Sequence, residues 1–163
     1  MTRTMHAVRC HTWTPYLDLP LEEIPVPPLG VGQIRIAVHY SGVSFATSLV
    51  TEGRYQRKPP LPFTPGTEVA GVITEIAPGV SGFSLGDRVC AGIDWGGHAE
   101  EVCVEPTTTY RVPDAMGLDV APQFPLSYGT SYAALVWRAG LKAGETVLVN
   151  GAAGAVGLAA VEI

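Results

Sequence analysis

The sequence predicts a β-rich barrel followed by the first strand, turn and helix of an α/β domain that is incomplete within the chain. Short β-rich runs separated by Gly and Pro indicate the barrel. A change to helical periodicity after Pro125 and a glycine-rich turn near the last residue indicate the α/β part. We therefore assign residues 1–125 to the first domain and residues 126–163 to the beginning of the second.

The runs assigned to the barrel have the length and punctuation of short strands. Residues 33–40 alternate polar and apolar side chains, which is the pattern of a half-buried strand. A helical insert is expected at residues 45–52, with Phe45 packed at its start. The expected strands are residues 7–12, 17–24, 33–40, 69–76, 88–93, 99–104 and 109–112.

After Pro125 the pattern becomes that of a strand and helices. Residues 126–139 are long and periodic enough for a helix, and Gly140 is a suitable C-terminal stop. Residues 146–150, Thr-Val-Leu-Val-Asn, are expected to form a buried strand that leads into the glycine-rich turn.

The turn reads A-x-G-x-x-G from Ala152 to Gly157. Missing side chains in such a turn allow a tight bend, a close approach of the backbone to a pyrophosphate, and close packing of helix on strand. A helix starting near Gly154 would direct free N–H groups and the positive end of its dipole at the phosphates. A helix of small residues that packs closely on a neighbour would show the same glycines. The assignment of the turn to phosphate binding therefore depends on the strand expected before it and the helix expected after it. The residues expected to bind a dinucleotide are Asn150, Gly151, Ala152, Ala153, Gly154, Ala155, Val156 and Gly157.

The composition is that of a folded protein, with 47% hydrophobic and 15% charged residues. The net charge of −5, with no basic cluster beyond Arg54, Arg57 and Lys58, argues against nucleic acid as a partner. No apolar run reaches the roughly 20 residues that span a bilayer, and the first residues lack the apolar core of a signal peptide. We expect no membrane partner and a cytoplasmic location.

The cysteines and histidines lack the spacing of a metal site or a disulfide framework. No C-x-x-C, H-x-x-H or H-E-x-x-H pattern occurs, so structural roles are expected for all of them. These residues are Cys10, Cys90, Cys103, His6, His11, His39 and His98.

Several blocks of the sequence resemble one known family, in the expected order and over nearly the whole chain. The chain is similar to the medium-chain dehydrogenase/reductase superfamily, and within it to the zeta-crystallin-like quinone oxidoreductases. The resemblance implies a GroES-like barrel followed by a Rossmann domain of which only the first strand, turn and helix are present. The blocks are residues 42–47, 53–55, 61–73, 86–89 with 96–100, 128–135, and the glycine turn.

The family divides on zinc, and the residue types here indicate a zinc-independent member. Ser44 stands where zinc-dependent alcohol dehydrogenases have a Cys ligand, and Thr67 stands where they have a His. Leu126 aligns with the remaining ligand position. A catalytic zinc needs three protein ligands of the N, S or O type, so no metal site is expected. Thr67 and Glu68 are expected to support the barrel, Glu68 by pairing with an arginine.

The resemblance implies hydride transfer from NADPH to a quinone or an activated enone, with NADH as an open alternative. Thr130 would lie beside the nicotinamide. Ser44 occupies a position where many relatives carry Asn, and Tyr55 matches a Tyr that borders the substrate cleft. We therefore take Tyr55 and Ser44 as the catalytic candidates. The alternative for Tyr55 is a loop aromatic packed on Pro59 or Pro60.

Two other functions stay open at this stage. An enoyl reductase of polyketide type shares these blocks and also lacks zinc. A chain that truly ended at Ile163 would be a non-catalytic binding module built on the barrel. We expect the chain to be the front part of a longer enzyme, inactive alone and a homodimer at full length, with a small-molecule substrate. The sequence does not give the substrate's identity or the preference between NAD and NADP.

Overall fold

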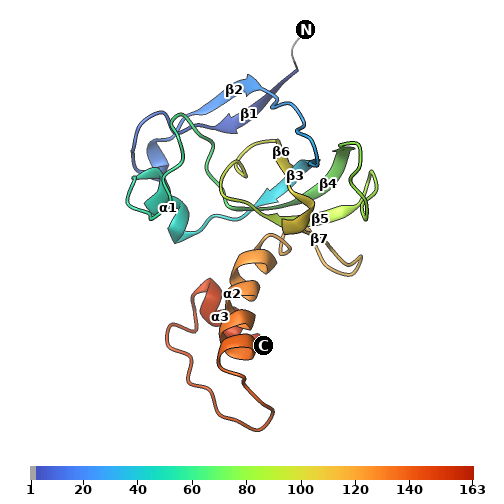
Figure 1. Cartoon of the computed structure of the whole chain (residues 1–163). Helices are drawn as coiled ribbons and strands as arrows, with labels where there is room; N and C mark the ends of the chain where they lie inside the picture. The colour runs from blue at the N-terminus through green and yellow to red at the C-terminus, as the bar shows by residue number, and fades with distance from the viewer. Residues whose placement is uncertain (1–2) are drawn as a thin grey trace. The chain divides into compact units, whose positions relative to one another are not determined.

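A computed structural model describes residues 3–163 (Figure 1). The chain divides into two compact units, Met1–Pro122 and Gln123–Ile163. The first unit contains all the strands of the described residues, and the second contains only helices and connecting loops. The division falls between Pro122 and Gln123, close to the boundary placed at Pro125.

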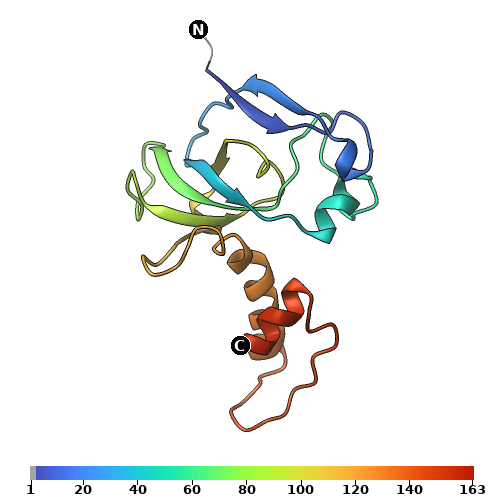
Figure 2. The same cartoon turned by 180° about the vertical axis from the view of Figure 1, so that it is seen from behind.

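The first unit is built on an antiparallel sheet of five strands, in the order β6-β3-β4-β5-β7. A separate two-stranded sheet pairs β1 with β2. Figures 1 and 2 show the larger sheet curling around itself, as the strands of a small barrel do. The strands are β1 (Thr4–Val8), β2 (Leu21–Pro25), β3 (Ile34–Ser41), β4 (Glu68–Ile76), β5 (Arg88–Gly92), β6 (Glu101–Val104) and β7 (Thr109–Arg111).

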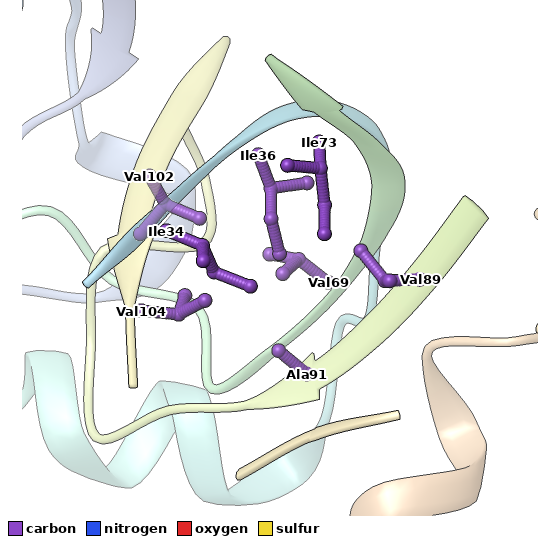
Figure 3. Close-up of a cluster of buried hydrophobic side chains, with 8 residues drawn as sticks. All are labelled: Ile34, Ile36, Val69, Ile73, Val89, Ala91, Val102 and Val104. Atoms are coloured by element: carbon purple, nitrogen blue, oxygen red, sulfur yellow. The ribbon is translucent and has the colours of Figure 1, made fainter. Parts of the chain in front are cut away.

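The core fills the concave side of this curved sheet. Successive side chains of a strand point to opposite faces, so every second residue of β3, β5 and β6 turns inward. Figure 3 shows these apolar side chains pointing into the space that the ribbons enclose. They are Ile34, Ile36, Val69, Ile73, Val89, Ala91, Val102 and Val104, each at most 7% exposed.

The strand assignment from sequence is confirmed for the central sheet and shifted at the N-terminus. Strands β3 and β4 differ from the expected 33–40 and 69–76 by one residue at their ends. The first strand ends at Val8, whereas residues 7–12 were expected. Beyond Val8 the chain leaves β2, because the Cys10 amide donates to the Phe63 carbonyl at 2.8 Å instead. Residues 16–18 form the short helix η1 (Tyr16–Asp18), so β2 begins only at Leu21.

The helical insert is confirmed as α1 (Phe45–Thr51). Its Val50 packs with Cys10 and Phe63 in a small second cluster of the first unit. The expected packing of Phe45 is wrong, because this side chain is 79% exposed. A further short helix, η2 (Pro106–Thr108), leads into β7.

The second unit contains a helical segment and one separate helix. The segment runs through η3 (Phe124–Tyr128), α2 (Gly129–Tyr132) and η4 (Ala133–Arg138), and η3 and η4 have the wider turns of a π-helix. Gly140 ends it at a φ of +65°, a left-handed conformation that favours glycine, and the Leu141 amide donates to the Leu135 carbonyl at 3.0 Å. Helix α3 (Ala155–Glu162) follows the glycine turn. None of the helices in residues 3–163 has the length and apolar character needed to cross a membrane.

The buried strand expected at residues 146–150 is not formed. These residues have no regular secondary structure, and Leu148 is 86% exposed while Val147 is 41% exposed. A strand needs a neighbour to accept and donate its backbone hydrogen bonds. The part of the second unit that the structure describes contains no other strand, so this apolar run has no partner.

Gly71 provides a test of how closely β3 and β4 approach. A Cβ at this position would lie 1.9 Å from the Ala37 carbonyl oxygen, which is a backbone atom that cannot rotate away. We expect Gly71→Ala to lower the free energy of unfolding by about 1–3 kcal/mol or more, because it forces these strands apart. Urea unfolding measures the loss. Gly129→Ala is the matched control, since its Cβ meets nothing closer than 3.8 Å, and equal losses in the two variants would contradict the packing.

Candidate functional site

The residues predicted for the site are divided between the two units. Ser44 and Tyr55 belong to the first unit, and Thr130 and the glycine turn belong to the second. Each group has a local structure that decides what its side chains and backbone can offer a ligand.

Ser44 is the N-cap of α1. Its backbone is extended, with φ −124° and ψ 160°, and its Oγ accepts a hydrogen bond from the Thr47 amide at 3.3 Å. The Thr47 hydroxyl lies 3.2 Å from the same Oγ. When Thr47 donates this bond, the Ser44 hydroxyl hydrogen stays available to a ligand. The serine therefore both starts the helix and presents a partly exposed polar atom.

The residues on either side of Ser44 are apolar and exposed. Val43 is 71% and Phe45 is 79% exposed, although both are side chains that normally gain free energy by burial. A polar hydroxyl flanked by two exposed apolar side chains is a surface suited to a small, mainly apolar molecule with one polar group.

Tyr55 lies in the loop after α1 and is half-buried. Its ring packs against the cluster of Cys10, Val50 and Phe63. Its backbone is tied to the helix by a 3.1 Å bond from the Tyr55 amide to the Leu49 carbonyl. Within residues 3–163 the Tyr55 hydroxyl has no hydrogen-bond partner, so the phenol is held by its ring and can still donate or accept.

His98 holds the turn that leads to Ser44. The His98 Nε2 lies 3.0 Å from the Gly42 carbonyl oxygen, and the His98 Nδ1 lies 3.0 Å from the Tyr16 hydroxyl. A carbonyl only accepts, so Nε2 carries the hydrogen and Nδ1 accepts from Tyr16. Burial lowers the pKa of His98, and the bond to Gly42 opposes that shift in part. The imidazole is therefore a neutral structural link, in agreement with the structural role expected for it.

Gly66 makes room for this histidine. Its φ is +96°, and a Cβ there would lie 2.5 Å from the His98 ring and 2.7 Å from the His98 backbone nitrogen. The His98 amide in turn donates to the Pro65 carbonyl at 2.9 Å. The segment before Thr67 and the segment at His98 are thus in direct backbone contact. This contact fixes the position of Thr67, the residue directly before β4.

Among residues 3–163 Glu68 has no arginine partner, so the expected ion pair is wrong. The residue is 6% exposed, and its Oε2 has no hydrogen-bond partner within residues 3–163. Its other oxygen lies against Gly42, where a Cβ would come within 2.2 Å of it. Burial raises the pKa of the Glu68 carboxyl, because a charge without a partner is costly to desolvate. Glu68 therefore supports the Gly42 turn by packing.

In the second unit the glycine turn has the conformation that its residues require. Gly151 has a φ of +71°, which favours glycine. A Cβ on Gly157 would lie 2.2 Å from the Gly151 carbonyl oxygen and 2.9 Å from the Ala152 Cα. Only glycine at 157 lets the first turn of α3 approach the bend so closely.

The start of α3 can bind an anion. Gly154 is the N-cap and carries no side chain that could bond the first amides of the helix. The Leu158 amide makes the first intrahelical bond, to the Gly154 carbonyl at 2.7 Å, which leaves the amides of Ala155, Val156 and Gly157 without a helical acceptor. The turn itself is exposed. These features fit a pyrophosphate, which would satisfy the free amides and the helix dipole together.

Thr130 lies on α2 and is exposed. The next residue, Ser131, is 2% exposed, and its Oγ donates to the Val156 carbonyl at 2.6 Å. This bond ties α2 to the first turn of α3. Within the second unit, the threonine and the glycine turn are thus parts of one local packing arrangement.

The structure offers no ready metal site among residues 3–163, where no group of three or more His, Cys, Asp or Glu side chains is placed to hold an ion. Cys10 and Cys90 are buried and Cys103 is half-buried. Burial raises the pKa of the Cys90 thiol to about 11, so it stays protonated and a poor ligand at neutral pH.

The structure also gives roles to residues for which the sequence predicted no specific contact. Tyr16 and His98 brace the Ser44 turn, yet no spacing signals this, because residues 16 and 98 are joined only by the fold. The Gly66-Thr67-Glu68 and Gly97-His98 blocks were visible in the sequence, and their glycines are the signal that two backbones meet there.

Comparison with known proteins places this arrangement in a family. Residues 30–114 match the family described as the alcohol dehydrogenase GroES-like domain. The chain belongs to this family, within the medium-chain dehydrogenase/reductase superfamily. The resemblance and the fold class inferred from the sequence are thereby confirmed.

Individual relatives narrow the similarity to quinone oxidoreductases. Quinone oxidoreductase-like protein 2 of Rattus norvegicus is 43% identical over 145 residues, which cover 89% of this chain and 41% of that protein. A probable oxidoreductase from Mycobacterium abscessus matches with a TM-score of 0.93 and 37% identity, over 99% of this chain and 51% of its own. The quinone oxidoreductase of Thermus thermophilus, also solved in complex with NADPH, matches with a TM-score of 0.83 and 34% identity. The match covers 97% of this chain and 49% of that chain. The chain thus spans about half the length of these relatives or less.

The buried acid of the site gives a pH-dependent prediction. The pKa of Glu68 is raised in the folded state, so wild-type stability is greatest below the unfolded pKa and is lost as pH rises toward the folded one. Glu68→Gln cannot ionise. We expect the melting temperature of Glu68→Gln, relative to wild type, to increase as the pH rises above 4.5 and to level off once the pH exceeds the raised pKa of the folded state.

Asp114→Asn is the control, because Asp114 is an exposed carboxylate. Its melting temperature relative to wild type should change little over the same pH range. A difference between Glu68→Gln and wild type that does not depend on pH would show that Glu68 is not a desolvated acid.

Proposed function

We propose that this chain is the substrate-binding and phosphate-binding front part of a zinc-independent oxidoreductase that transfers hydride from NADPH to a quinone or an activated enone. The observation that carries the proposal is the exposed glycine turn, where free amides at the start of α3 fit a pyrophosphate. Support comes from membership of the dehydrogenase family and from the similarity to quinone oxidoreductases.

The residues proposed to hold the cofactor are Thr130 and residues 150–157. Small side chains from Gly151 to Ala155 leave the backbone open to the phosphates. NADPH is favoured over NADH because the Thermus relative forms a complex with NADPH. The bound nicotinamide would supply the hydride, and the protein would supply position and an electrostatic environment.

The substrate would bind at the surface around Ser44. Val43 and Phe45 offer apolar contacts, and the hydroxyls of Ser44 and Tyr55 offer hydrogen-bond donors. A quinone gains negative charge on an oxygen as it is reduced, and a donor aimed at that oxygen stabilises the charge. Because Tyr55 is fixed by its ring while its hydroxyl has no partner in residues 3–163, it is the stronger candidate for this role.

Zinc independence is proposed from the residue types at the ligand positions. Ser44 serves as a helix cap, Thr67 lies directly before β4, and Leu126 has no ligating atom. A catalytic zinc would find too few ligands among these three residues. A substrate that accepts hydride without a Lewis acid, such as a quinone, is consistent with this set.

Two other functions are distinguished by simple measurements. An enoyl reductase of polyketide type would turn over a crotonyl thioester faster than a quinone. A non-catalytic binding module would not bind NADPH at all. The exposed, side-chain-free start of α3 favours the enzymes over the binding module, because an anion is the natural partner of such a helix end.

The proposal predicts activity that does not need a metal. We expect the complete protein that contains this chain to oxidise NADPH when 1,4-benzoquinone or 9,10-phenanthrenequinone is added. Absorbance at 340 nm measures the rate. Incubation with EDTA and 1,10-phenanthroline should leave the rate unchanged, because no residue at the ligand positions requires zinc.

Metal analysis of the same preparation completes this test. Stoichiometric zinc, together with loss of activity after chelation, would overturn zinc independence. Failure to bind NADPH in a calorimetric titration would instead overturn the assignment of the glycine turn, so the two parts of the proposal are tested separately.

Tyr55→Phe tests the proposed donor. The substitution keeps the ring that packs on the Cys10, Val50 and Phe63 cluster and removes only the hydroxyl. We expect kcat for quinone reduction to fall by about tenfold, as removal of a hydrogen bond to a charged group predicts, while the Kd for NADPH is unchanged. Stopped-flow measurement of NADPH oxidation gives the rate.

Tyr110→Phe is the matched control, because Tyr110 is 54% exposed on β7. It removes a hydroxyl from the same unit without touching the proposed site. An equal change in both variants, or an unchanged rate for Tyr55→Phe, would limit Tyr55 to packing.

A further inference from the structure

The first unit contains a cavity that the proposed reaction does not use. Its volume is about 330 Å³, at the lower end of the range for small-molecule sites. It lies between the β1-β2 sheet, the loop at residues 60–64, the loop at residues 95–96 and strand β6. Neither Ser44 nor Tyr55 lines it. Its apolar walls include Met5, Ile24, Pro25, Phe63, Trp95 and Val102.

One uncompensated cation lines this cavity. Arg9 directs Nη1 to the Thr64 hydroxyl oxygen at 3.2 Å and Nη2 to the Pro62 carbonyl at 3.3 Å. Its Nε is buried and has no acceptor within residues 3–163. A guanidinium has five N–H donors in a planar fork, and neither of these two acceptors is charged. Arg9 therefore retains both its charge and unused donors.

The other charged group of the cavity is already neutralised. The Glu101 carboxylate pairs with Arg3 at 2.7 Å and with Arg35 at 3.6 Å. It therefore does not compensate Arg9, with which it forms no ion pair in the described structure. Among residues 3–163, Arg9 is therefore the charged group lining the cavity that lacks a counter-ion.

A second donor lies beside the guanidinium. Thr64 is 7% exposed, and its Oγ accepts from Arg9. Its own hydroxyl hydrogen has no acceptor in the described part of the chain. The lining of the cavity thus combines a guanidinium and a buried hydroxyl with prolines and aromatic side chains.

From this arrangement we propose that the cavity is a binding site for a small aromatic carboxylate, whose carboxyl group pairs with Arg9 and Thr64. The carboxylate matches the fork of the guanidinium and neutralises its charge. The ring occupies the apolar part between Phe63, Trp95 and the prolines. This site is independent of the proposed oxidoreductase activity, because it shares none of the residues assigned to cofactor or substrate.

The test is calorimetric titration of the 163-residue chain with 2-naphthoate and with the neutral analogue 2-naphthalenemethanol. We expect the carboxylate to bind at least about tenfold more tightly than the alcohol, which corresponds to ~1.4 kcal/mol. Higher salt should weaken only the carboxylate. Arg9→Gln should abolish this preference, and Thr64→Val should reduce it while keeping the shape of the wall.

Arg138→Gln is the matched control, because Arg138 is an exposed arginine of the second unit. It removes the same charge and should leave binding unchanged. Circular dichroism checks that each variant is folded, and Arg9→Lys, which keeps the charge but loses the fork, serves if Arg9→Gln does not fold. The proposal is overturned if the two ligands bind equally, if neither binds, or if the Arg9 variants bind 2-naphthoate as wild type does.

Discussion

The hydrogen bonds of the turn at Gly42 determine where the segment that carries Ser44 lies in the first unit. On one side the Gly42 amide and the Ser41 hydroxyl both donate to the Glu68 carbonyl, at 3.1 and 3.0 Å. On the other side the Gly42 carbonyl accepts from His98. These bonds attach the end of β3 to the start of β4 and to the loop before β6. The position of Ser44 follows from them, because the serine comes directly after the turn.

The curved sheet supplies the rigidity that these bonds need. Its core side chains come from β3, β4, β5 and β6, and the first two of these strands meet at the Gly42 turn and at Glu68. Burial of branched side chains therefore fixes strand ends, and strand ends fix the loops that carry polar groups. The buried Glu68 carboxyl is tolerated within this frame as a desolvated acid.

Much of the fold was readable from the sequence, because alternation and glycine positions are local signals. Strands β3, β4 and β5 and helix α1 lie where the periodicity places them. Residues 146–150 were assigned incorrectly, since a strand depends on a partner that a local pattern does not report. The predicted packing of Phe45 and the predicted arginine partner of Glu68 were wrong for the same reason. Both depend on which distant residues come near, as do the contacts of Arg9 with Pro62 and Thr64. The candidate residues Ser44, Tyr55 and Thr130 came from the family resemblance.

The role of Ser44 as the N-cap of α1 has a consequence for which residues this position can hold. A helix start favours Ser, Thr, Asp or Asn, and replacing one of them with an apolar residue costs about 1 kcal/mol. Asn at this position would satisfy the same requirement. Stability alone therefore selects for a short polar side chain beside the exposed Val43 and Phe45, whatever molecule binds there. The fold by itself thus keeps a hydrogen-bonding group next to these two apolar side chains.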